Sequence, residues 1–109
     1  MSEEEQRAKD AIRLLRVLVD QAMAKADDVP SAEDTVGFTV VPTTATASWA
    51  GGMDLNTPRY FAARDWLLEA GALVRDDAAG SLGAYVDGEP EPFKITQRGI
   101  DLLREWGSL

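Results

Sequence analysis

The sequence predicts a single α+β domain, made of a three-helix core, a small antiparallel sheet and a C-terminal helix. Three patterns indicate this fold: a long apolar stripe of helical period near the start, two short helical segments around a turn, and β-type runs before a last amphipathic segment. The 109 residues and the 45% apolar content suffice for one core. We therefore expect one domain over residues 1–109.

Composition narrows the function classes. The chain contains neither cysteine nor histidine, so the usual thiolate ligands, the usual general base and the usual imidazole metal ligand are all missing. We therefore expect no enzyme activity, no metal and no cofactor. The chain also has no apolar leader, and charged residues interrupt its longest apolar stretch, so we expect a cytoplasmic protein without a membrane span.

The first 27 residues are expected to form the N-terminal helix. Ser2 stands three residues before Glu5, the spacing of a capping box, and apolar residues then recur at steps of three and four. Leu14 and Val17 make the apolar stripe wider than a small core usually needs. Two interpretations are open: a generously buried core helix, or contact with a second copy of the chain.

A polar loop is expected over residues 28–35, followed by a short strand. Pro30 interrupts any helix in the loop. The strand, residues 36–41, is rich in β-branched and aromatic side chains and places Val36, Phe38 and Val40 on one side.

Two helices around a turn are expected in the middle of the chain. The first covers residues 43–50, and the connection covers residues 53–56. Thr57 then caps a second helix that has Pro58 at its first position, and Gly71 ends it.

Short strands and a last helix complete the pattern. Residues 72–75, 85–86 and 93–96 have the composition of strands, with a glycine-containing hairpin tip at residues 76–83. The last helix carries apolar residues at Ile100, Leu102, Leu103 and Trp106.

Several motifs share one register. Phe93 to Leu103 follows the pattern aromatic-x-apolar-Thr-x-x-Gly-x-x-Leu-Leu, Trp49 to Asn56 has the pattern of a helix leading into a turn, and Gly71 closes the next helix. From Val36 to Trp106 the chain resembles the winged helix-turn-helix family of bacterial regulators, of which the MarR-like and PadR-like groups are examples. The resemblance implies a winged helix-turn-helix fold for residues 36–109.

The resemblance also implies a DNA-binding transcriptional regulator that acts as a homodimer, with the first and last helices supplying the contact between protomers. In this family the third helix enters the major groove and the wing approaches the adjacent backbone. The candidate residues for contact with double-stranded DNA are Ser48, Asn56, Thr57, Arg59, Phe61 and Ala62.

Charge favours a different function. The net charge is −8, and residues 76–92 contain five carboxylates and neither lysine nor arginine, so this wing would repel phosphates. Large apolar groups that helical geometry turns away from the core often mark protein interfaces. The alternative function is therefore a winged-helix module that binds protein and not DNA, with candidate interface residues Leu14, Val17, Phe61, Trp66 and Trp106.

Overall fold

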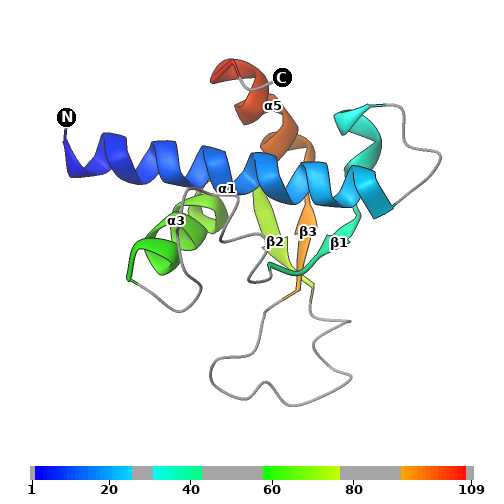
Figure 1. Cartoon of the computed structure of the whole chain (residues 1–109), viewed down its shortest axis with the longest axis horizontal. Coiled ribbons are helices and arrows are strands. Elements are labelled where there is room, and N and C mark those ends of the chain that lie inside the picture. The colour runs from blue at the N-terminus through cyan, green and yellow to red at the C-terminus, as the bar shows by residue number, and fades with distance from the viewer. Residues whose placement is uncertain (1, 26–30, 43–57, 77–91, 108–109) are drawn as a thin grey trace, which may run out of the picture.

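The computed structural model describes residues 2–25, 31–42, 58–76 and 92–107 (Figure 1). They form an α+β fold of three α-helices, one short 3-10 helix and a small three-stranded antiparallel sheet. In chain order the elements are α1 (Glu3–Lys25), η1 (Ala32–Thr35), β1 (Thr39–Val40), α3 (Pro58–Glu69), β2 (Leu73–Arg75), β3 (Phe93–Ile95) and α5 (Gln97–Glu105).

Helix α1 begins where the capping pattern predicts. The Ser2 hydroxyl accepts a hydrogen bond from the backbone N–H of Glu5 at 3.2 Å, which satisfies one of the free donors of the first turn. Three glutamates in that turn face the positive end of the helix dipole. The N-terminal helix is thus confirmed, although its last described residue is Lys25.

Helix α1 is the central element of the fold. Figure 1 shows it crossing most of the view, with α5 above it and with α3 and the three strands below it. Its apolar stripe is buried against α3, α5, η1 and β1. Leu14 is fully buried in this chain, so the width of the stripe reflects a helix that is covered from several sides.

The sheet has the strand order β1-β3-β2, and both pairs are antiparallel. Phe93 on the central strand lies opposite Val40 on β1 and Arg75 on β2, and Ile95 lies opposite Leu73. Both β3 residues are fully buried, so this strand carries the main contact between the sheet and the helices.

Strand β1 is shorter than the sequence predicts. Gly37 adopts a φ of 89°, which breaks the two-residue alternation, and Val36 is 37% exposed and not on the buried side with Val40. Pairing still continues one step beyond the strand, because Gly37 N–H donates to the Ile95 carbonyl at 2.7 Å and Ile95 N–H donates to the Phe38 carbonyl at 3.1 Å.

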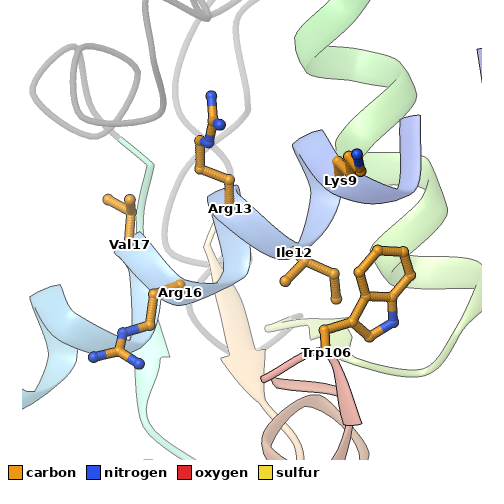
Figure 2. Close-up of a pocket in the computed structure, with 6 residues that line it drawn as sticks. All are labelled: Lys9, Ile12, Arg13, Arg16, Val17 and Trp106. Carbon is orange, nitrogen blue, oxygen red and sulfur yellow. The ribbon is translucent and has the colours of Figure 1, made fainter. Parts of the chain in front are cut away.

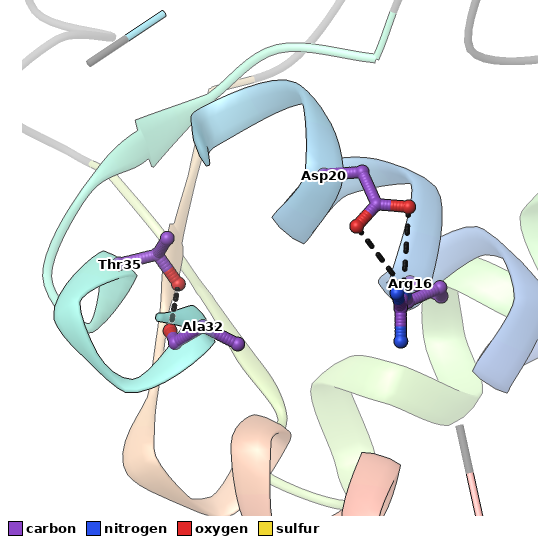
Figure 3. A network of polar contacts seen from close by, with 4 residues as sticks. All are labelled: Arg16, Asp20, Ala32 and Thr35. Carbon is purple, nitrogen blue, oxygen red and sulfur yellow. Dashed lines mark hydrogen bonds and ion pairs between the residues drawn. The ribbon is translucent and has the colours of Figure 1, made fainter. Parts of the chain in front are cut away.

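The described part of the predicted loop, residues 31–35, contains the 3-10 helix η1, which the polar composition of the segment does not predict. The Thr35 hydroxyl donates to the carbonyl of Ala32 at 2.6 Å, and both residues are buried (Figure 3). Such local side-chain bonds compete with extended backbone and tighten a turn. An ion pair between Glu33 and Arg104 links η1 to α5.

Helix α3 ends where the sequence predicts. Tyr60, Ala63 and Leu67 are buried. At its end, Gly71 has a φ of 75°, its N–H donates to the Leu68 carbonyl, and Ala72 N–H donates to the Leu67 carbonyl at 2.9 Å. This pair of bonds is a Schellman motif, which requires a left-handed residue and favours glycine there.

The junction between β3 and α5 is tightly bonded. Thr96 is the N-cap of α5, and its hydroxyl accepts from the Gly99 N–H at 3.1 Å. The same hydroxyl is the donor to the carbonyl oxygens of Gly71, at 2.5 Å, and Ala72, at 2.9 Å, which share its hydrogen. The threonine therefore joins the start of α5 to the turn between α3 and β2.

The expected helix over residues 43–50, the connection at 53–56, the cap Thr57, the strand at 85–86 and the hairpin tip from residue 77 lie outside the described residues. Within the described ranges, no helix combines the length and the apolar character needed to cross a membrane.

Candidate nucleic-acid interface

The start of α3 carries the described part of the predicted DNA contact. Pro58 and Arg59 are exposed, while Phe61 and Ala62 are half-buried. The other candidates, Ser48, Asn56 and Thr57, lie outside the described residues.

Arg59 makes a two-pronged ion pair with Asp10 of α1. Its Nε donates to Oδ2 at 2.8 Å and its Nη2 donates to Oδ1 at 2.7 Å. The Asp10 side chain is only 5% exposed, whereas that of Arg59 is 46% exposed. Gln6 also donates to Oδ1 of Asp10, at 3.0 Å. The pair therefore fixes the direction of the guanidinium and ties α3 to α1, yet leaves part of the arginine in solvent.

The pair is charged at neutral pH. The hydrogen bonds from Arg59 lower the pKa of Asp10 below its ordinary value of 3.8, against the opposing effect of burial, and the bond to Asp10 raises the pKa of Arg59. A bidentate arginine–carboxylate pair of this geometry is stronger than a single hydrogen bond between neutral groups.

The pair predicts a pH-dependent stability difference between the wild type and Asp10→Asn. The pKa of Asp10 is lower in the folded state than in the unfolded state. Its charge therefore stabilises the fold at pH values above the unfolded-state pKa, and this stabilisation is lost as the pH falls through the folded-state pKa. We expect Asp10→Asn to lower the unfolding free energy by about 1–2 kcal/mol at pH 7, because Arg59 is half exposed and its attraction is partly screened. Urea unfolding from pH 7 to pH 2 measures this difference. It should shrink below pH 4, and a difference that stays constant down to pH 2 would show that the charged pair does not stabilise the fold.

Phe61 is covered on two sides by its neighbours on α3. The guanidinium carbon of Arg64 lies 4.7 Å from the Phe61 ring centroid, and the Tyr60 ring meets it edge-on with centroids 5.7 Å apart. Arg64 also pairs with Asp65, at 2.9 Å between Nη2 and Oδ1. Phe61 therefore exposes part of its ring to solvent, and the Arg64 guanidinium packs on that ring as a cation–π contact.

The charge around the candidate interface is mixed. Besides Arg59, α3 exposes Asp65 and Glu69. On the sheet, Lys94 lies between Thr39 and Val74 in one exposed cross-strand row. At the base of the predicted wing, buried Asp76 accepts a hydrogen bond from the Thr39 hydroxyl. The exposed surface of α3 thus offers few cations to phosphates.

The aromatic candidates on two different helices meet. Trp66 of α3 and Trp106, the C-cap of α5, make an edge-to-face contact with centroids 6.5 Å apart and planes at 87°. Trp66 is half-buried, while Trp106 remains 44% exposed. Of the other interface candidates, Val17 is half-buried and Leu14 is a core residue that offers no surface.

Comparison with known proteins adds no assignment, because no family model, curated protein or solved structure matches the chain. Among the described residues, no group of three or more acidic side chains is placed to hold a metal ion.

Proposed function

We propose that this chain is a winged helix-turn-helix protein that binds double-stranded DNA and regulates transcription. The observation that carries the proposal is the path of the chain: α3 leads directly into β2, and β2 and β3 pair as the base of a hairpin in a sheet of order β1-β3-β2. In the winged-helix arrangement this order places a helix for the major groove immediately before the wing.

Arg59 is the side chain best placed to contact DNA. It lies in the first turn of α3, the part of a recognition helix that reaches base edges, and nearly half of its side chain is in solvent. A guanidinium can donate two parallel hydrogen bonds to guanine or to a phosphate. Lys94, exposed on the central strand, offers a second charge for the backbone.

Asp10 competes with DNA for Arg59 in this proposal. Both carboxylate oxygens of Asp10 accept hydrogen bonds from the arginine, so DNA binding has to break or share a charged pair. Asp10 would therefore lower the affinity of the protein for DNA, because part of the binding free energy is spent on separating Arg59 from Asp10. This competition gives the proposal a test in which two substitutions act in opposite directions.

We expect Arg59→Ala to weaken binding to duplex DNA about 10-fold, and Asp10→Asn to strengthen it about 3-fold because the guanidinium is released. Fluorescence anisotropy with a labelled mixed-sequence duplex at low salt measures both effects. Lys9→Gln is the matched control, because it removes an exposed positive charge from α1 without touching the pair. Equal affinity of wild type, Arg59→Ala and Asp10→Asn would reject Arg59 as a DNA contact.

A protein-binding module is the second candidate function. The observation that favours it is the surface of α3, where the exposed arginine is paired and the neighbouring exposed charges, Asp65 and Glu69, are acidic. Such a surface suits a protein partner better than phosphates, and the half-buried Phe61 ring would supply apolar contact.

A further inference from the structure

A groove lies along the outer side of α1, beside the end of α5. Its volume is about 330 Å³, and it is lined by Lys9, Ile12, Arg13, Arg16, Val17 and Trp106 (Figure 2). Helix α3, which carries the proposed DNA contact, contributes none of these residues. The groove is therefore a second surface, and a function assigned to it is independent of DNA binding.

Three cations line the groove in a row. Lys9, Arg13 and Arg16 are spaced four and three residues apart, so they share one face of α1 over two turns, a span of about 10 Å. Arg16 donates from Nε to both oxygens of Asp20, at 3.0 and 3.2 Å (Figure 3). Lys9 and Arg13 are exposed and make no ion pair with any other residue that the structure describes. A chain of net charge −8 thus carries a local positive row.

The apolar part of the groove is formed by Trp106 and Ile12, and the position of the Trp106 indole is fixed by its neighbours. Figure 2 shows the Trp106 indole facing Ile12, which is 5% exposed and forms the floor. Behind it, the edge contact with Trp66 orients the indole. An exposed tryptophan whose direction is fixed loses little conformational entropy on binding, and tryptophan is the residue type most enriched at binding hot spots.

We infer that this groove binds an acidic amphipathic helix of a partner protein. Carboxylates on successive turns of that helix would pair with Lys9 and Arg13, and an apolar side chain between them would contact Trp106 and Ile12. The positive row supplies the charge complementarity, and its length of two turns matches a helical segment better than a single small anion, which needs only one cation. This surface is distinct from the α3 surface on which the second candidate function rests.

Two other occupants fit less well. A symmetric pair of chains would bring Lys9, Arg13 and Arg16 of both copies into one interface, so like charges would accumulate there. We therefore do not assign this groove to the homodimer that the family resemblance implies. Single-stranded nucleic acid fits less well because, among the described residues that line the groove, Trp106 alone offers a ring on which a base could stack.

The test uses a designed alanine-rich peptide of about 20 residues, which forms a helix more readily than a shorter one, with glutamates four residues apart and a leucine between them on the same face. A twin peptide with glutamine at both glutamate positions is the control. We expect the wild-type protein to bind the glutamate peptide at least 10-fold more tightly in fluorescence anisotropy. Nuclear magnetic resonance shifts should change at Lys9 to Val17 and at the Trp106 indole.

Variants locate the site. We expect Arg13→Gln to weaken peptide binding about 3-fold and Trp106→Ala about 30-fold. Lys94→Gln removes the same charge from the sheet and should change nothing, as should Arg59→Ala, which separates this site from the DNA contact. The double variant Lys9→Glu, Arg13→Glu should instead bind a peptide with lysines in place of the glutamates, which shows a charge-specific contact even if Trp106→Ala unfolds.

Three results would overturn the inference. The first is failure to bind the glutamate peptide at millimolar concentration, and the second is equal affinity for the glutamate and glutamine peptides. The third is displacement of the peptide by an oligo-dT strand that shifts the same residues, which would assign the groove to nucleic acid.

Discussion

Gly99→Ala is expected to lower the unfolding free energy by at least about 3 kcal/mol and the melting temperature by more than about 10 °C. A Cβ atom at Gly99 would lie 2.5 Å from the carbonyl oxygen of Ala72 and 3.3 Å from its carbonyl carbon. Both atoms belong to the backbone and cannot rotate away. That carbonyl also accepts a hydrogen bond from the Thr96 hydroxyl, so moving it would disturb the cap of α5.

Thermal unfolding followed by circular dichroism tests this expectation. Gln97→Ala is the control, because Gln97 is exposed in the same turn of α5 and makes only a surface hydrogen bond to Asp101 at 3.2 Å. We expect it to cost less than about 0.5 kcal/mol. If Gly99→Ala unfolded at the same temperature as Gln97→Ala, the close approach of α5 to the turn after α3 would be wrong.

The second large effect is expected for Phe93→Ala. Phe93 is fully buried on the central strand, opposite Val40 and Arg75, so truncation leaves a cavity between the sheet and the helices. Removal of a buried phenylalanine costs about 3–5 kcal/mol, whereas Phe93→Leu should cost less than about 2 kcal/mol, since most of the volume stays filled. Urea unfolding of the two variants gives the comparison, and similar costs for both would show that the strand is not packed as described.

The closing motif is the part of the chain whose structure is most readily predicted from the sequence. Its pattern from Phe93 to Leu103 indicates a strand that leads into a helix, and four of its positions now have a physical reason. Phe93 and Ile95 point to the core, Thr96 caps the helix, and Gly99 leaves room for the Ala72 carbonyl. Local rules of alternation and capping suffice here because the contacts that matter are close in the chain or enforced by one strand register.

The ion pair between Asp10 and Arg59 could not be predicted in this way. The resemblance implies that Arg59 is a DNA contact near the start of its helix, and its side chain is partly exposed, but its partner Asp10 lies 49 residues earlier, on α1. Nothing in the spacing of either helix selects Asp10 among the 19 acidic residues. Only the packing of α1 against α3 brings the two side chains together.

The groove could not be predicted from the sequence for the same reason: its residues come from distant parts of the chain. The positive row of Lys9, Arg13 and Arg16 is visible in the sequence, where it has the pattern of an ordinary solvated face. Its apolar wall, Trp106, comes from the far end of the chain and is oriented by Trp66 of α3. A site lined by α1 and by the C-cap of α5 depends on how these helices are oriented relative to each other, which pattern rules do not supply.

The proposed function depends above all on DNA binding by the wild-type protein, and a titration with mixed-sequence duplex at several salt concentrations measures it. We expect binding at low salt, and the logarithm of the affinity should fall by a few units per unit of the logarithm of salt concentration, because the proposal assigns only Arg59 and Lys94 to contacts with phosphates. Absence of binding at the lowest salt would contradict the DNA-binding proposal and leave the protein-binding function.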